Sequence, residues 1–378
     1  MDCLHRLVEA WTGPPRAAPI SSRSVDLLLL GTGWTGSFLL PIAADAGFRT
    51  ASTTRDGSNG TIPFHFDPDV DGDDDLEQYM RLPNATTVVI IFPLYDGEHS
   101  KRLVRSYERT RDEDVARPRF ILLGSTGIYN NGSTLQAKIA WDSPKTALPP
   151  MTELKGKLKK HQKTPRSPWI DRNSEYDTTN PRAAAEDAFL ALSTASPPSR
   201  VSVLCLSGLW GHGRSPRRFI AAMASSKQRL RALGSLSLVH GRDVVRAILA
   251  MHSLWARAEG QRWVLTNDRY YDFWDLASRW GGAGEAGRNH PPRGPQGKWV
   301  QELMAESQQQ ESTNNLVEGL DEDENTIADK GAGLVQGPYS STGAVRALPR
   351  TPEQCGEALD SSEFWRTFDL VPAVPWVD

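Results

Sequence analysis

The first candidate functional segment is a glycine loop, Gly31-Thr32-Gly33-Trp34-Thr35-Gly36. In a G-x-G-x-x-G loop the first glycine permits a tight turn, the second lets the backbone approach a pyrophosphate, and the third lets a helix pack closely on a strand. Free N–H groups at the start of the following helix then face the phosphates. All six residues are candidate contacts to a dinucleotide, although an ordinary strand-to-helix glycine turn is the alternative.

The choice of dinucleotide depends on the end of the second expected strand. Thr53-Thr54-Arg55 stands there before Asp56. An arginine pairs with a 2′-phosphate, whereas a carboxylate binds the ribose 2′-hydroxyl. We therefore expect NADP, with NAD possible through Asp56. A second expected contact is Phe92-Pro93-Leu94, where a backbone turn could line the cofactor; the alternative is strand termination by proline.

A possible proton donor follows the strand at residues 119–124. Ser125 and Thr126 could bind a substrate carbonyl or the cofactor, and Tyr129 could act as an acid in the same pocket. These three residues are the catalytic candidates. The alternatives are that the hydroxyls close a turn and that Tyr129 only covers the cofactor.

Three cationic or titratable side chains are candidates for binding an anionic substrate: Arg182, His212 and Arg214. Arg182 could instead pair with Glu186 one helical turn later, which is the favoured interpretation. His212 and Arg214 could equally be solvent-facing groups of a glycine-rich connection. We expect His240 and Asp243 to serve a strand-to-helix turn rather than catalysis.

These residues need a framework of alternating strands and helices. Apolar runs predict strands at 27–30, 48–54, 62–66, 87–92, 119–124 and 201–207, and helical spacing predicts helices at 37–46, 76–81, 100–110 and 181–192. The alternation predicts an α/β, Rossmann-type doubly wound parallel sheet with ligands at the carboxyl ends of its strands.

We expect three regions. Residues 1–23 form an N-terminal extension, residues 24–210 the Rossmann domain, and residues 211–378 a smaller C-terminal substrate lobe. A basic insertion at 131–168 and a mobile loop at 281–343 interrupt the pattern. Aromatic residues predict a terminal helix at 362–370 that packs onto the second lobe.

Composition narrows the classes of partner. The 378 residues carry a formal net charge of −3, which does not favour a nucleic-acid partner. The cysteines are Cys3, Cys205 and Cys355, and their scatter indicates neither a disulfide framework nor a metal site. No apolar run approaches the roughly 20 residues that cross a bilayer. We expect a cytoplasmic monomer or homodimer that acts on a small molecule.

Read in order, five segments resemble the extended and atypical short-chain dehydrogenase/reductase superfamily, in particular its NAD(P)-dependent epimerase/dehydratase-like branch. They are the glycine loop, the strand end at residues 53–55, Gly124-Ser125-Thr126-Gly127-Ile128-Tyr129, the stretch at 206–214 and the stretch at 239–245. The resemblance covers about residues 24–280. It implies an oxidoreductase or epimerase-like enzyme of small-molecule metabolism, for which Arg55 makes NADP the expected cofactor.

The chain departs from this family at its catalytic pattern. Such enzymes use a Tyr-x-x-x-Lys helix, whose lysine lowers the pKa of the tyrosine. No Tyr-x-x-x-Lys occurs here, and Pro181-Arg182-Ala183-Ala184-Ala185-Glu186 stands in its place. Two alternatives therefore stay open: a catalytically silent NAD(P)-binding regulatory or scaffold protein, and a redox-neutral isomerase or lyase.

Overall fold

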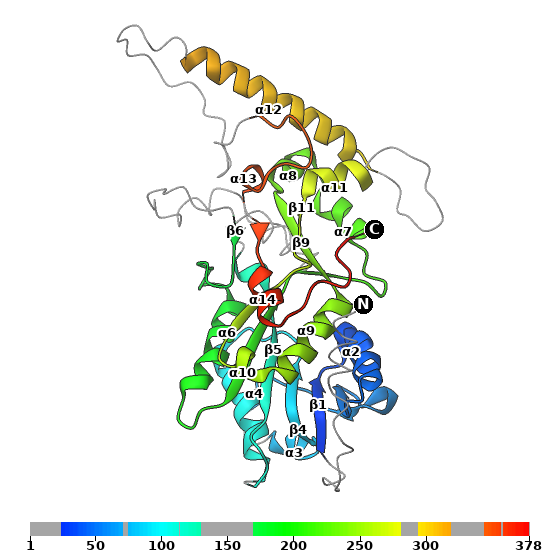
Figure 1. Ribbon diagram of the computed structural model, residues 1–378, viewed down its shortest axis with the longest axis vertical. Helices are drawn as coiled ribbons and strands as arrows, with labels where there is room; N and C mark the ends of the chain where they lie inside the picture. Colours follow the sequence, from blue (N-terminus) through cyan, green and yellow to red (C-terminus); the bar gives the residue numbers. More distant parts are fainter. Residues whose placement is uncertain are drawn as a thin grey trace.

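The computed structural model describes residues 24–70, 75–112, 114–129, 169–280, 294–318, 344–356 and 358–377. The expected N-terminal extension and the basic insertion lie outside the described residues. The molecule is elongated, with a large sheet at one end and a smaller lobe at the other (Figure 1). In the described part, no helix combines the length and apolar character needed to cross a membrane.

A seven-stranded parallel sheet forms the larger body. Its order is β10 (Arg262–Leu265), β7 (Arg200–Leu206), β5 (Arg119–Ser125), β4 (Asn84–Ile90), β1 (Ser24–Leu30), β2 (Thr50–Thr54) and β3 (Ile62–Pro63). All six strand pairs are parallel. The order reverses between β1 and β4, which creates the crevice where doubly wound sheets bind ligands. The α/β fold class expected from the sequence is confirmed.

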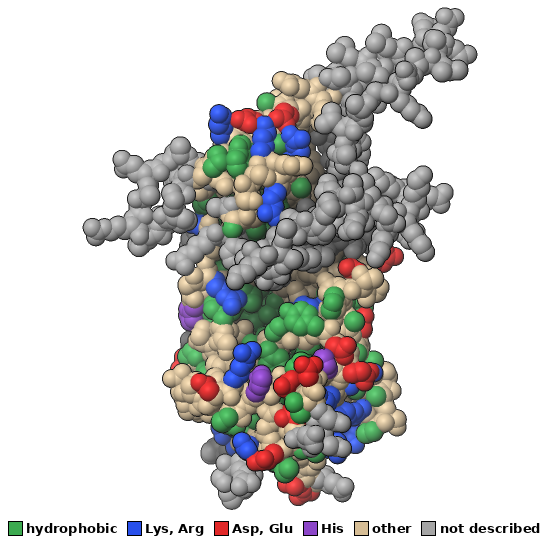
Figure 2. Space-filling model, turned by 180° about the vertical axis from the view of Figure 1, so that it is seen from behind, with side chains coloured by type: hydrophobic (Ala, Val, Ile, Leu, Met, Phe, Trp, Pro, Cys, Tyr) green, Lys and Arg blue, Asp and Glu red, His purple; other side chains and the backbone are tan. Residues whose placement is uncertain are grey.

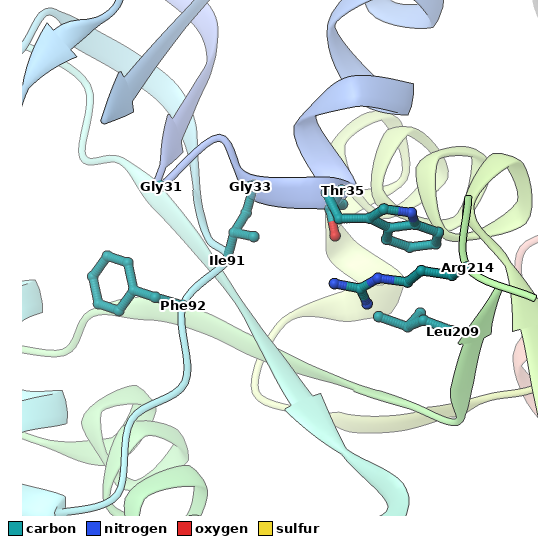
Figure 3. Close-up of a pocket in the computed structure, with 8 residues that line it drawn as sticks. Gly31, Gly33, Thr35, Ile91, Phe92, Leu209 and Arg214 are labelled. Carbon is teal, nitrogen blue, oxygen red and sulfur yellow. The ribbon is translucent and has the colours of Figure 1, made fainter. Parts of the chain in front are cut away.

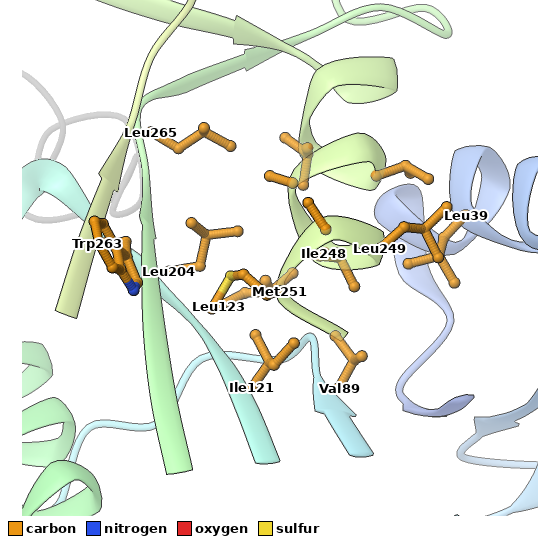
Figure 4. Packing of buried hydrophobic residues seen from close by; sticks show 14 of the residues in the cluster. Leu39, Val89, Ile121, Leu123, Leu204, Ile248, Leu249, Met251, Trp263 and Leu265 are labelled. Carbon is orange, nitrogen blue, oxygen red and sulfur yellow. The ribbon is translucent and has the colours of Figure 1, made fainter. Parts of the chain in front are cut away.

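Helices cover both faces of this sheet. One layer holds α2 (Gly33–Asp45), α9 (Gly241–Ser253), α10 (Trp255–Ala258) and α14 (Ser362–Thr367). The other holds α3 (Leu76–Met80), α4 (Gly97–Arg109) and α6 (Pro181–Ala191). Leu39 of α2 and Ile248 of α9 are fully buried with sheet residues such as Val89 (Figure 4). Consecutive apolar residues in the central strands face these two layers alternately, which explains why the strands lack polar alternation.

The smaller lobe is built on a three-stranded sheet of order β11 (Tyr270–Asp272), β9 (Ser235–His240) and β8 (Gly208–Trp210). Its apolar cluster joins α7 (Pro216–Met223), α8 (Lys227–Ala232), α11 (Phe273–Trp280) and α12 (Gln296–Glu318). The short elements β6 (Trp169–Ile170), β12 (Ala358–Leu359) and α13 (Pro352–Cys355) complete the strands and α-helices of the described residues. Acidic and basic side chains are intermingled on the face shown in Figure 2.

Part of the expected loop at 281–343 is a helix. α12 runs along the outer end of the lobe (Figure 1). Val300 and Leu303 are buried against the lobe, and Lys227 of α8 pairs with Glu302 and Glu306 at 2.6 Å each. The prediction of a loop was wrong for this segment because tertiary packing and ion pairs stabilise a helix whose own sequence is mostly polar.

The boundary between the two bodies also differs from expectation. β10 and α9 lie beyond residue 210 but belong to the large sheet and its helical layer. The terminal helix α14 exists, but it does not pack onto the second lobe. Its Phe364 and Phe368 rings lie 5.8 and 5.3 Å from the ring of Trp263 on β10, so the helix covers the edge of the large sheet.

Candidate functional site

The glycine loop connects β1 to α2 and has the backbone that its sequence predicts. Gly31 and Gly33 adopt φ values of +79° and +47°, which are strained for residues with a Cβ. A Cβ on Gly36 would lie 2.5 Å from the Thr32 side chain, so only glycine fits where the helix turns onto the strand. The loop therefore brings the N-terminus of α2 to the carboxyl edge of the sheet.

Thr53 of β2 fixes this loop from the neighbouring strand. The Gly31 N–H donates to Thr53 Oγ1 at 2.8 Å, and the Thr53 hydroxyl donates to the Leu29 carbonyl at 3.3 Å. The Thr32 N–H and hydroxyl both donate to the Thr53 carbonyl, at 2.9 and 3.0 Å. Thr53 is fully buried. Sequence reasoning placed Thr53 at the strand end but did not anticipate that its hydroxyl holds the loop.

A cavity of about 320 Å³ opens directly on this loop (Figure 3). It is lined by Gly31, Gly33, Trp34, Thr35, Ile91, Phe92, Leu209 and Arg214. Four of the six expected loop residues thus meet the residues after β4 and two residues of the 206–214 stretch, whereas Thr32 and Gly36 do not line the cavity. No carboxylate is among these lining residues. Ile91 and Leu209 were not among the expected contacts, although both lie in segments that the sequence singled out.

The end of β4 contributes only part of the contact that was expected there. Phe92 lines the cavity and stacks on Phe66 with ring centroids 5.9 Å apart. Pro93 is exposed, whereas Leu94 is buried in the core beneath the sheet and does not line the cavity. The Leu94 side chain therefore does not reach the cavity, and the backbone contact expected of Leu94 stays a prediction.

Arg55 and Asp56 lie just past the end of β2 and differ in their hydrogen bonding. The Asp56 carboxylate accepts from the Ser58 N–H at 3.1 Å and the Thr54 hydroxyl at 3.0 Å, and these bonds hold its pKa below the usual range. Arg55 is exposed. The carboxylate is thus engaged in its own turn, while the guanidinium extends from the strand end that faces the adenosine side of such sites.

Ser125 and Thr126 close the end of β5. Ser125 Oγ accepts from the Gly127 N–H at 3.1 Å, and the Thr126 hydroxyl donates to the Leu206 carbonyl at 3.3 Å. Both residues are buried. Their observed hydrogen bonds are those of a turn, which was the structural alternative considered for them.

Tyr129 is also buried, and its phenol is engaged. The hydroxyl donates to the Arg172 carbonyl at 3.2 Å, and the ring packs edge-on against Tyr176 at 5.8 Å. Burial raises the pKa of Tyr129 well above its usual value. An acid that gives up its proton during catalysis needs a pKa near the working pH. This geometry gives Tyr129 a packing role.

The positions of the missing tyrosine and lysine are held by Arg182 and Glu186 on α6. The Arg182 guanidinium donates to the Leu123 carbonyl at 3.1 Å and lies 5.8 Å from the ring of Tyr95, an exposed residue after β4. The expected Arg182–Glu186 pair does not form. Glu186 lies instead 3.4 Å from Arg262, because its side chain turns into the core.

Glu186 is almost fully buried beneath the end of β5. Its carboxylate accepts from the Ser125 N–H at 3.0 Å and from the Cys205 thiol at 3.3 Å. Burial raises the pKa of Glu186, and Arg262 opposes that shift. A carboxylate held in this way fixes the turn after β5 and is not available to replace a ribose-binding lysine.

His240 and Asp243 have the structural roles expected of them. His240 Nδ1 accepts from the Arg242 N–H at 3.2 Å and caps α9. The fully buried Asp243 accepts from the N–H groups of Ala373 and Val374 at 2.7 and 2.9 Å, and from Arg246 at 2.9 Å. Asp243 therefore ties the C-terminal segment to the start of α9.

Comparison with other proteins gives similarity only at the level of solved structures. No family model matches the chain, and no curated protein matches it. A putative NAD-dependent epimerase/dehydratase from Methylobacillus flagellatus is 17% identical over 71% of this chain and 86% of its own, with a TM-score of 0.46. UDP-glucose 4-epimerase from Brucella ovis, in complex with NAD, is 15% identical over 71% of this chain and 88% of its own, with a TM-score of 0.43.

A third solved structure, UDP-N-acetylglucosamine 4-epimerase from Bacillus cereus, is 11% identical over 67% of this chain and 82% of its own, with a TM-score of 0.42. The class of the protein follows from its own sheet and loop. A parallel sheet that reverses between β1 and β4, with a glycine loop at the reversal, defines a Rossmann-type fold. The three solved structures resemble the chain in fold alone.

Proposed function

We propose that this protein binds a nicotinamide dinucleotide on the Gly31–Gly36 loop. The observation that carries the proposal is the cavity on that loop, which has the start of α2 at one wall, Arg214 at another and no carboxylate among its lining residues. The N–H groups of Trp34 and Thr35 belong to the first turn of α2, where intrahelical acceptors are missing. Together with the helix dipole they favour a phosphate.

The dinucleotide that fits best is NADP. Arg55 extends from the end of β2, where its planar guanidinium can pair with a 2′-phosphate. Asp56 would be the residue to bind an unphosphorylated ribose, but its carboxylate accepts bonds from its own turn. The charge of Arg55 therefore favours NADP over NAD at this position.

The reaction that suits this site is an oxidoreductase or epimerase-like conversion of a small metabolite. The nicotinamide supplies hydride chemistry when bound. In this chain, the end of β5 offers hydroxyls at Ser125 and Thr126, and Arg182 offers a fixed cation for an anionic group of a substrate. Arg182 binds and orients in this proposal but does not transfer a proton, because an arginine stays protonated at neutral pH.

A second candidate function, an NADP-binding regulatory protein, is favoured by one group of observations. The positions where related enzymes place tyrosine and lysine hold Arg182 and the buried Glu186, and the Tyr129 phenol bonds to a backbone carbonyl. Arg182 stays protonated near pH 7, the Tyr129 phenol is buried and bonded to a carbonyl, and the Glu186 carboxylate is buried and engaged by Ser125 and Cys205, so none of the three offers a substrate a proton to exchange. Such a protein would bind the dinucleotide without turnover.

Two measurements test these proposals. Titration of NADPH and NADH into the protein and into Arg55→Ala should show tighter binding of NADPH by the unaltered chain, and a loss of about tenfold for NADPH alone in the variant. Equal affinities in both proteins would refute the 2′-phosphate assignment. A panel of carbonyl and alcohol substrates is then followed at 340 nm, where an oxidoreductase changes the absorbance of the cofactor, and by analysis of the products, because an epimerase restores its cofactor in each turnover. A regulator changes neither the absorbance nor the substrate.

A further inference from the structure

A tight turn of the smaller lobe reaches back to the glycine loop. Gly211 and Arg214 exchange both backbone hydrogen bonds, at 2.9 and 3.0 Å. Between them, His212 and Gly213 adopt φ values of +40° and +82°. Positive φ at both central residues is typical of a type I′ turn, which reverses the chain in the smallest number of residues. Arg214 is thereby held in one place relative to Gly211.

This turn is attached to one face of α2. The Trp34 indole N–H donates to the Gly211 carbonyl at 3.0 Å, and Ser37 Oγ lies 3.1 Å from Nδ1 of His212. The His212 ring stacks on Phe38 with centroids 3.5 Å apart. Trp34, Ser37 and Phe38 have the i, i+3, i+4 spacing of neighbours on one helix face. The turn is therefore fixed against the helix whose N-terminus forms the cavity.

The attachment directs Arg214 into the cavity. Its guanidinium carbon lies 4.6 Å from the centre of the Trp34 ring, and the residue lines the cavity with Gly31 and Gly33. In Figure 3 the side chain extends from the side of Leu209 toward Gly33 and Ile91. Among the described residues no carboxylate forms an ion pair with it, and none lines the cavity. The guanidinium thus brings an uncompensated positive charge to the phosphate loop.

We infer that Arg214 binds the pyrophosphate of the dinucleotide, so that both lobes build the cofactor site. This inference rests on the proposed function. The start of α2 supplies only partial charges, whereas a guanidinium supplies a full charge and parallel N–H donors to a phosphate. The sequence assigned Arg214 to the substrate, but the contact with Trp34 places it at the cofactor loop. Arg55 stands past the end of β2 and does not line the cavity, so in this proposal the two arginines serve different phosphates.

The experiment titrates NADPH and NADH into the full chain and into Arg214→Gln. Because pyrophosphate is common to both nucleotides, the variant should lose about tenfold in affinity for each of them by the same factor. Arg214→Lys keeps the charge but loses the paired N–H donors of the guanidinium, so its affinities should lie between those of the unaltered chain and Arg214→Gln. Arg242→Gln removes an exposed charge from α9 and serves as the control, with affinities unchanged. Arg214 is exposed, and circular dichroism checks that its variants fold.

The results separate this inference from the proposed function. Unchanged affinity of Arg214→Gln for both nucleotides would overturn the role of Arg214 while leaving the proposed function intact. A loss for NADPH alone would place Arg214 at the 2′-phosphate and would also overturn the inference. If the unaltered chain binds neither nucleotide, the proposed function itself fails, and the inference fails with it.

Discussion

Thr53→Val is the most informative single change, because it keeps the shape of the side chain and removes one hydroxyl. Valine suits a buried strand position, so the backbone of β2 should persist. The Gly31 N–H then loses its acceptor at 2.8 Å, and the Leu29 carbonyl loses a donor at 3.3 Å. The hydroxyl is fully buried, so water cannot replace it without rearrangement.

The size of the effect follows from the cost of leaving a buried donor unsatisfied, which is about 1–3 kcal/mol. We expect the free energy of unfolding to fall by about 2 kcal/mol. The dinucleotide must then reorder the loop when it binds. NADPH affinity falls by up to about thirtyfold if reordering the loop costs all of that free energy. Urea denaturation measures the first quantity and NADPH fluorescence titration the second.

Thr87→Val on β4 is the matched control. The Thr87 side chain is fully buried, and its hydroxyl lies 2.8 Å from Nδ1 of His252, away from the glycine loop. Its loss should lower the free energy of unfolding and leave NADPH affinity unchanged. If Thr53→Val keeps the stability and the affinity of the unaltered protein, then Thr53 does not hold the phosphate loop and the reasoning is wrong.

Three further changes probe the rest of the structure. Burial, aided by Arg119, lowers the pKa of His252 to about 4, so the free energy of unfolding should fall by on the order of 3 kcal/mol as the pH drops from 6.5 toward 4. His252→Gln should flatten this pH dependence in thermal unfolding. An equally steep profile in the variant would contradict the assignment. Tyr129→Phe should lower the free energy of unfolding by about 1 kcal/mol in urea denaturation and leave NADPH affinity unchanged. A large loss of affinity would show that Tyr129 belongs to the cofactor site. Asp243→Ala should lower the free energy of unfolding by about 3–5 kcal/mol and expose residues 371–377 to proteolysis. If the C-terminal segment of the variant resists proteolysis, contacts other than those of Asp243 hold that segment.

The parts of the fold that could be predicted from the sequence are those set by local pattern. β1, the glycine loop and α2 follow from an apolar run, a glycine spacing and a helical period within about twenty residues. The helix α12 could not be predicted in this way. Its buried residues Val300 and Leu303 are few, and the ion pairs with Lys227 join segments 75 or more residues apart.

The candidate site shows the same division. The loop and Arg55 follow from sequence spacing, because both lie where the motif itself places them. The packing role of Tyr129 depends on a carbonyl at Arg172, and the role of Arg214 depends on the ring of Trp34. Such contacts arise from the packing of segments that are distant in the sequence, so no local sequence pattern predicts them.

NADPH titrations of two glycine substitutions test whether the glycine loop binds the dinucleotide. Gly33 and Gly47 lie at opposite ends of α2 with φ values of +47° and +78°, so alanine brings similar backbone strain, about 1–2 kcal/mol, to both. A Cβ at Gly33 stands in the cavity 3.7 Å from Ile91, whereas one at Gly47 meets nothing within 4 Å. NADPH should bind the unaltered protein and Gly47→Ala equally and Gly33→Ala at least about tenfold more weakly. Equal binding by all three proteins, or no binding by the unaltered chain, would contradict the claim.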